Sequence, residues 1–362
     1  MSVSTYFSNS YAEAREKFLN ACVQAGLPTT SYINPSAQGP SGEELYTDIV
    51  HIGPERADTV LVVISGTHGV EGFCGSGCQV GFLREGLYKE APAETAIVLV
   101  HALNPYGFAN ARRVNEDNVD LNRNFIDHDQ PQPTNAAYDE IHHLLIPSDW
   151  GGPGQARADQ ELARIIGQRG QKAIQAAITG GQYSHADGLF YGGSEPSWSN
   201  RMWRGIIREH LMAYRHVALV DLHSGLGRYG YGEPIFRGRF EGDGYARARR
   251  WYGEDVTSSE DGTSTSSQIM GNVASALDEE IGEAVLTAIT LEFGTNPLPV
   301  VLNALRADHW LHARGERDSP LGDQIKAQIL DAFYCNNDEW KLLVWERAVE
   351  ILRRGLAGLR SS

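Results

Sequence analysis

Four short runs of apolar, largely β-branched residues recur along this chain of 362 residues and constrain its fold more than any other feature. The runs are TVLVVISG (59–66), AIVLVHALNP (96–105), HVALVDLHSG (216–225) and AVLTAITLEFG (284–294). Continuous apolar runs of this length are typical of strands that helices cover on both faces. The chain is therefore predicted to form an α/β fold, with a mostly parallel sheet between two helical layers.

Helical periodicity fills most of the sequence between and after these runs. The predicted helices are 10–26, 71–86, 157–178, 198–213, 299–313, 322–334 and 338–358, and one further strand is predicted at 45–52. The Pro/Gly/Ser-rich segment 34–42 is predicted to be a connection, and the polar, acidic segment 251–268 a long exposed loop near a site. Because no linker separates the four runs, a single domain over residues 1–362 is expected.

The charge balance excludes several classes of partner. The chain has 31 Lys and Arg against 46 Asp and Glu, a formal net charge of −15, and this argues against nucleic acid and against an anionic membrane surface. No apolar run is long enough to cross a membrane, and the N-terminal segment lacks the pattern of a secretory signal, so a cytoplasmic location is expected. The four cysteines are too few and too scattered for a disulfide framework.

Polar or ionisable side chains follow all four apolar runs. His68 and Glu71 come directly after the first run, His223 lies at the end of the third, and Glu292 at the end of the fourth. The carboxyl ends of parallel strands meet at one edge of a sheet, which is where sites form in open α/β folds. Two histidines and a carboxylate are a common zinc ligand set in hydrolases, and Glu292 is then a spare carboxylate that could act as a base.

Five motifs in this order resemble the zinc carboxypeptidase superfamily. They are HGVE, NP-x-G, R-x(6)-DLNRNF, DLHSG and LEFGT. That superfamily includes pancreatic-type and cytosolic carboxypeptidases and, more distantly, the aspartoacylase and succinylglutamate desuccinylase deacylases. Nearly the whole chain also resembles a bacterial family of unknown function grouped with these peptidases.

The resemblance implies an architecture. It predicts a twisted, mixed sheet of roughly eight strands sandwiched by helices. The catalytic core would span about 45–300, with an insertion at about 127–200 and C-terminal helices at about 299–358.

The resemblance also implies a role for each site residue. His68, Glu71 and His223 would bind one Zn²⁺ per chain, and Glu292 would be the general base and acid. Arg113, chosen over its neighbour Arg112 on spacing, would polarise the scissile carbonyl.

Further residues of the same segment are implied to hold the substrate. Asn122 and Arg123 would bind its terminal carboxylate, and Arg112 is a further substrate-binding candidate. Asp120 would accept a hydrogen bond from His68 and fix the orientation of the ring. A mobile tyrosine, which pancreatic enzymes place over the substrate, has three candidates here: Tyr191, Tyr229 and Tyr231.

Three functions therefore stay open. The first is a metallocarboxypeptidase for short peptides or amino-acid conjugates, which Asn122 and Arg123 favour. The second is a deacylase of small N-acyl amino acids, which a long insertion over the cleft favours. The third is a non-catalytic zinc-binding protein, which the complete set of ligands and Glu292 disfavours. Because the proposed pocket gathers arginines around one zinc, the predicted substrate is small and anionic.

Overall fold

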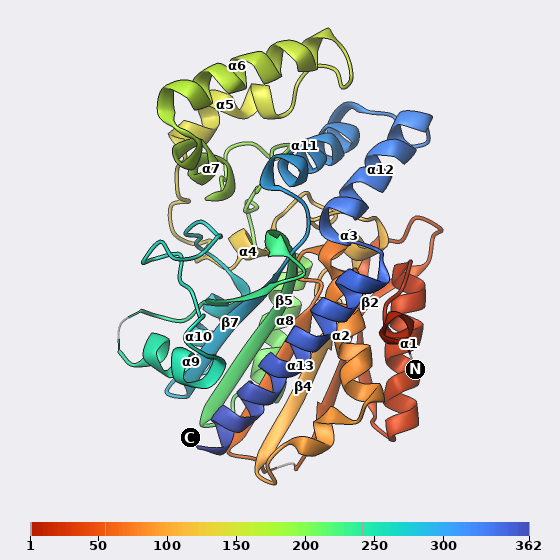
Figure 1. Cartoon of the computed structure of the whole chain (residues 1–362), viewed down its shortest axis with the longest axis vertical. Coiled ribbons are helices and arrows are strands. Elements are labelled where there is room, and N and C mark those ends of the chain that lie inside the picture. Colours follow the sequence, from red (N-terminus) through yellow and green to blue (C-terminus); the bar gives the residue numbers. More distant parts are fainter. Residues whose placement is uncertain (1, 55, 241, 362) are drawn as a thin grey trace.

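The structure, a computed structural model, describes residues 2–54, 56–240 and 242–361, and its centre is a mixed sheet of seven strands (Figure 1). The strand order is β1-β2-β4-β3-β5-β7-β6. The strands are β1 (Thr29–Gln38), β2 (Glu44–Ile52), β3 (Thr59–Ser65), β4 (Thr95–His101), β5 (His216–Tyr229), β6 (Gly232–Phe236) and β7 (Val285–Gly294). The mixed sheet is confirmed, with one strand fewer than the roughly eight expected.

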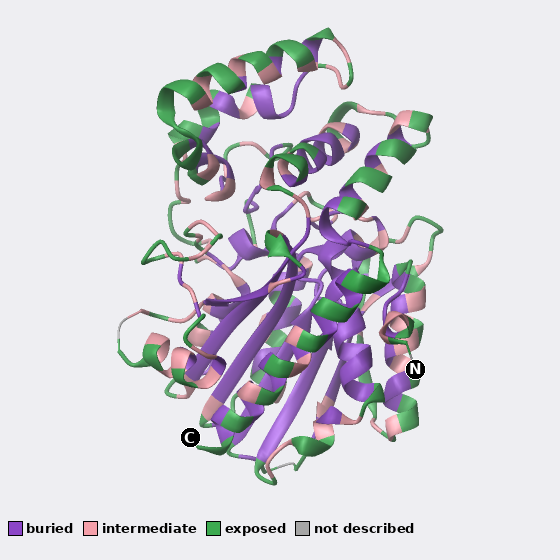
Figure 2. Cartoon of the chain, in the orientation of Figure 1, coloured by how far each residue is buried: buried purple, intermediate pink, exposed green. Residues whose placement is uncertain are grey.

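The four apolar runs form the parallel centre of this sheet. β4, β3, β5 and β7 pair in parallel, whereas β1, β2 and β6 are antiparallel to their neighbours. Every residue of β3 and β4 is buried, as Figure 2 shows for the middle of the sheet. Alternate residues of β3 face opposite layers, Leu61 and Val63 on one side and Val62 and Ile64 on the other. This two-sided burial explains why the runs are continuously apolar.

Helices cover both faces of the sheet. One face packs against α1 (Tyr11–Ala25), α2 (Gly72–Arg84), α9 (Gly244–Tyr252) and α13 (Asp338–Arg360), and the other against α8 (Trp198–His210) and α10 (Val273–Glu280). The long C-terminal helix α13 runs across the front of the sheet beside α2 in Figure 1. No helix in the described part of the chain is long and apolar enough to span a membrane.

A third group of helices stands beyond one end of the sheet, at the top of Figure 1. It contains α5 (Ala136–Leu145), α6 (Pro153–Arg169) and α7 (Gln171–Thr179) together with α11 (Leu298–Arg314) and α12 (Pro320–Phe333). These helices share a hydrophobic cluster of their own, in which Ile141 and Ile174 join Val301 and Leu305. Two short helices, α3 (Pro105–Ala109) and α4 (Leu121–Asn124), lie between this group and the sheet.

Two predicted elements differ from the structure. The helix predicted at 157–178 is two helices, because Gly170 between α6 and α7 has a left-handed φ of 87°. The connection predicted at 34–42 is wrong over its first half, since β1 extends to Gln38. There the pairing with β2 shifts register between Ile33 and Gln38, so an edge strand accommodates Pro35.

The predicted loop and the cysteines agree with the structure, whereas several short elements were not predicted. The predicted loop 251–268 starts at the end of α9, and residues 253–272 contain no helix and no named strand. All four cysteines are free and buried. The short elements β6, α3, α5, α9 and α10 had no clear sequence signal.

Close backbone packing at Gly69 joins the turn after β3 to the segment after α3. The amide of Gly69 donates to the carbonyl of Arg113 at 3.0 Å, and the amide of Val70 donates to the carbonyl of Arg112 at 2.8 Å. A Cβ at position 69 would lie only 2.0 Å from the carbonyl carbon of Gly107. Glycine is therefore the residue that lets these two segments, and the side chains they carry, approach each other.

We predict that Gly69→Ala destabilises the protein, because the added methyl group forces the two backbone segments apart. Overpacking of this kind costs about 1–3 kcal/mol or more, and thermal unfolding would measure it. Gly205→Ala in α8 is the matched control, since nothing lies within 4 Å of its added Cβ and the helix should gain stability. Equal midpoints for Gly69→Ala and the wild type would contradict the prediction.

Candidate metal centre

Three predicted ligands, His68, Glu71 and His223, converge at the carboxyl end of the parallel strands. His68 follows β3, Glu71 lies in the short 3-10 helix Gly69–Glu71 that leads into α2, and His223 lies on β5. Glu71 Oε1 is 2.9 Å from His68 Nδ1, Glu71 Oε2 is 2.8 Å from His223 Nδ1, and the two Nδ1 atoms are 3.0 Å apart. All three side chains are buried.

The outward-facing nitrogen of each imidazole meets a buried carboxylate. His68 Nε2 lies 3.1 Å from Asp120 Oδ1, and His223 Nε2 lies 2.6 Å from Asp221 Oδ2. Asp221 also accepts a hydrogen bond from Thr67 Oγ1 at 2.7 Å. A carboxylate on the outer nitrogen fixes the ring and directs the inner nitrogen toward a metal.

Asp221 was missed in the sequence, although a signal for it was present. It precedes His223 by two residues on β5, and residues two apart on a strand lie on the same face.

The electrostatics of this cluster fit a cation at its centre. Burial alone would lower the pKa of His223, but Asp221 and Glu71 raise it to about 10. Burial alone would raise the pKa of Glu71, but His68 and His223 hold it well below its ordinary value. The surroundings of these three facing side chains thus favour a positive charge. Two imidazole nitrogens and a carboxylate are a zinc donor set, so the residues present fit that ion.

Glu292 lies next to this cluster on β7, in register with His223 of β5. Its Oε1 accepts a hydrogen bond from the amide of Leu226 at 3.0 Å. Burial, with a further contribution from the negative charge of Glu71, raises the pKa of Glu292 to about 7. A carboxyl group with a pKa near neutrality can both take up and release a proton at physiological pH.

Arg113 connects the candidate metal ligands to Asp120. Its Nη1 donates to Glu71 Oε1 at 2.7 Å and its Nε donates to Asp120 Oδ2 at 3.1 Å. Burial disfavours a charged guanidinium, but Asp120 and Glu71 raise the pKa of Arg113 above its ordinary value. The structure thus holds a permanent cation at the edge of the metal centre.

Asn122 and Arg123 also lie in the same pocket. Arg123 donates to two backbone carbonyls, that of Asn122 at 3.1 Å and that of Thr179 at 2.5 Å. The ring of Phe190 lies against both cations, with its centroid 5.3 Å from the guanidinium carbon of Arg123 and 5.2 Å from that of Arg113.

Arg112 does not reach the pocket, contrary to the prediction that it binds substrate. Its Nε donates to the buried Asp308 at 2.9 Å and its Nη2 donates to Asn118 at 2.9 Å. These two contacts engage the guanidinium of Arg112, and Arg112 is not among the residues that line the pocket. The tyrosine candidates Tyr191, Tyr229 and Tyr231 do not line the pocket either.

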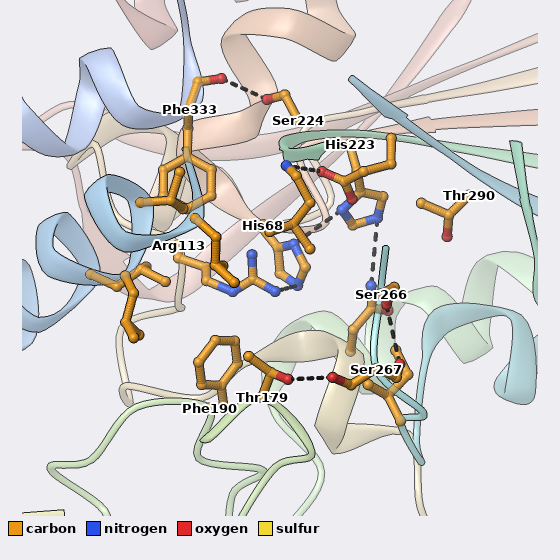
Figure 3. Close-up of a pocket in the computed structure, with 18 of the residues that line it drawn as sticks. His68, Arg113, Thr179, Phe190, His223, Ser224, Ser266, Ser267, Thr290 and Phe333 are labelled. Carbon is orange, nitrogen blue, oxygen red and sulfur yellow. Dashed lines mark hydrogen bonds between the residues drawn. The ribbon is translucent and has the colours of Figure 1, made fainter. Parts of the chain in front are cut away.

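Figure 3 shows the pocket that these residues line, and the space between their atoms, including open solvent, is about 710 Å³. One wall of the pocket is apolar. It contains Phe190 and Phe333, together with four residues from the first half of α11: Leu298, Val301, Leu302 and Leu305. The opposite side is polar and includes Arg237, Ser266, Ser267 and Thr290. These wall residues carry no motif, so sequence reasoning did not find them.

Comparison with known proteins identifies the family. The family described as a protein of unknown function, DUF2817, matches residues 7–347, and the chain therefore belongs to that family. No curated protein matches the sequence.

Solved structures show the fold. Bovine thrombin-activatable fibrinolysis inhibitor, solved in complex with tick carboxypeptidase inhibitor, is 11% identical, with 98% of each chain covered and a TM-score of 0.51. A second structure of thrombin-activatable fibrinolysis inhibitor is 12% identical, covers 98% of this chain and 75% of that one, and has a TM-score of 0.54. Carboxypeptidase A from Helicoverpa armigera is 14% identical, with 90% and 74% covered and a TM-score of 0.46. The predicted carboxypeptidase-like fold is confirmed.

We predict that Asp221→Asn weakens zinc binding by about 10- to 100-fold, because the amide no longer fixes the His223 ring as a charged acceptor does. Competition with a chromogenic chelator would measure the affinity. Asp323→Asn, at an exposed position of α12, is the control and should bind zinc as the wild type does. An unchanged zinc affinity in Asp221→Asn would show that Asp221 does not help His223 to bind zinc.

Proposed function

We propose that this chain is a zinc-dependent hydrolase that cleaves an amide bond next to a free carboxylate, as a carboxypeptidase of short peptides or amino-acid conjugates does. One observation carries the proposal: His68, Glu71 and His223 present three facing donor atoms, and the separate buried carboxyl of Glu292 lies beside them. The carboxypeptidase-like fold is consistent with this arrangement.

The proposed chemistry assigns each side chain a task. His68, Glu71 and His223 would hold a zinc ion, which would supply Lewis acidity to polarise a carbonyl and make water easier to deprotonate. Glu292 takes the proton of the attacking water and then delivers it to the nitrogen of the leaving amine. Its raised pKa suits both steps, although a nearby cation would draw that pKa down.

Arg113 and Arg123 act on the substrate through their charge. Arg113, at the edge of the metal centre, would stabilise the negative charge that develops on the carbonyl oxygen, an effect of about 3 kcal/mol for one well-placed donor. Arg123, together with the neighbouring Asn122, would bind the terminal carboxylate, since a guanidinium pairs with carboxylates through two hydrogen bonds. Both arginines line the pocket that contains His68 and His223.

The second candidate is a deacylase of small N-acyl amino acids, and one observation favours it. Gln175 and Thr179 of α7, together with Phe190, line the pocket, so the segment proposed as an insertion would narrow the access to it. A covered pocket of this kind suits small molecules better than polypeptides. Both candidates share the metal centre and Glu292, and they differ in the acyl group that the apolar wall would accept.

We predict that the zinc-loaded protein hydrolyses short substrates with a free terminal carboxylate and loses most of this activity when that carboxylate is amidated. Rates on matched dipeptides, their amides and N-acetyl amino acids would be measured, with chelated protein as the blank. Undiminished hydrolysis of the amides would exclude the carboxylate-binding role of Arg123. Cleavage of N-acetyl amino acids alone would select the deacylase.

We further predict that Glu292→Gln lowers kcat by about 10²- to 10⁴-fold, because an amide cannot carry the proton. Zinc content should stay at one ion per chain, since Glu292 is not one of the three facing donors. Glu283→Gln, exposed just before β7, is the matched control and should keep full activity. Full activity in Glu292→Gln with zinc bound would overturn the assignment.

A further inference from the structure

One cation of the pocket has no part in the function proposed above. Arg237 follows β6 and lines the pocket together with His68 and Glu292. Its Nε donates to Thr290 Oγ1 at 3.0 Å and its Nη2 donates to Ser266 Oγ at 3.1 Å, so both of these partners are neutral hydroxyls. Within the described residues, Arg237 forms no ion pair.

The other arginines near the centre differ from Arg237 in this respect. Arg112 pairs with Asp308 at 2.9 Å, Arg113 pairs with Glu71 at 2.7 Å, and Arg123 lies 3.6 Å from Asp120. Arg237 is half-buried, and the carboxylates that act on it, Glu292, Asp221 and Glu233, form no ion pair with it, so its positive charge is only partly compensated. Burial lowers the pKa of Arg237 to about 10, which still leaves it charged at neutral pH. The position therefore gains stability when an anion binds.

The surroundings of Arg237 provide further hydrogen-bonding groups. Ser266, Ser267 and Thr290 lie along one side of the pocket, away from Phe333 (Figure 3). Hydroxyl groups beside a guanidinium can donate to the oxygens of a bound carboxylate. The apolar wall lies opposite, so this polar side is where a charged substrate group can be accommodated.

The position of Arg237 relative to Glu292 indicates which part of the substrate it would contact. Its partner Thr290 precedes Glu292 by two residues on β7, which places the two side chains on the same face, about 7 Å apart. An anion at Arg237 would thus lie well away from the carbonyl under attack, within reach of a side chain of the amino acid that is released.

We propose that Arg237 selects substrates whose released amino acid carries a second carboxylate in its side chain, as glutamate and aspartate do. The inference rests on the proposed hydrolase function and specifies its substrate class. In this arrangement Arg123 and Asn122 bind the main-chain carboxylate, and Arg237 binds the side-chain carboxylate. The glutamine and asparagine analogues leave the guanidinium without a counter-charge and therefore bind more weakly.

The test compares matched substrates on the zinc-loaded, full-length protein. Peptides or N-acyl compounds ending in Glu and Gln, or in Asp and Asn, differ only in the charge that Arg237 would contact. We expect the wild type to prefer the acidic member by about tenfold or more in kcat/KM, mainly through KM. In Arg237→Gln the preference should disappear, because kcat/KM for the acidic member should fall to about that for the neutral member. Arg237→Lys should restore part of it.

A purely structural role of Arg237 predicts a different result. In that case Arg237→Gln would lower stability or the rates on both members equally, and the ratio would stay the same, which would overturn the proposal. Arg239→Gln is the matched control, because Arg239 is exposed and pairs with Asp278 on the surface. Its ratio should equal that of the wild type.

A binding measurement separates this inference from the hydrolase proposal. Calorimetric titration with free L-glutamate and L-glutamine should show glutamate binding about tenfold more tightly or better, and Arg237→Gln should abolish the difference. If no substrate is cleaved but this difference is present, the hydrolase proposal fails and the anion site remains. If substrates are cleaved without any acidic preference, in rate or in binding, the assignment of Arg237 fails alone.

Discussion

Buried negative charge at the carboxyl edge of the sheet is the constraint on which the rest of this structure depends. Glu71, Asp120 and Asp221 are almost inaccessible to water, and a buried carboxylate is tolerated only when opposite charge and hydrogen bonds surround it. Here the two imidazoles and Arg113 supply that surrounding. Asp221 depends most on a single partner, because without His223 it would keep only the hydroxyl of Thr67. The cluster therefore requires the segments that carry these side chains, which are far apart in the sequence, to stay in a single relative position.

The parallel sheet provides that position. The pairing of β3 with β5 places His223 beside the turn that carries His68 and Glu71, and the register of β5 with β7 sets Glu292 opposite His223. A slip by one residue would turn each side chain to the other face of the sheet. The continuous burial of the strands prevents such a slip, because it would also disturb both hydrophobic layers. The packing energy of the core thus maintains the geometry of the site.

Helices beyond one end of the sheet line the site. The hydrophobic cluster that joins α5–α7 to α11 and α12 holds one group of side chains over the centre, and this group includes the apolar wall. The polar side comes instead from the loop before α10 and from β7. The pocket thus has apolar side chains on one side and hydroxyl groups with Arg237 on the other. The two sides come from segments that are separate in the sequence and share no local sequence pattern.

The sequence by itself determined the parallel centre of the sheet, both helical layers and the meeting of His68, Glu71 and His223 at the candidate metal centre. These features follow from local patterns: apolar runs reveal buried strands, and the polar groups after them must gather at one edge. Spacing alone favours Arg113 over Arg112 in the sequence. In the structure Arg113 lines the pocket, whereas Arg112 pairs with Asp308, which is 196 residues away along the chain. The support of His223 by Asp221 and the exposure of Arg237 to the pocket likewise became evident only in three dimensions. Local patterns encode which face a residue occupies, whereas the partner of a charged group depends on long-range packing that no short stretch of sequence contains.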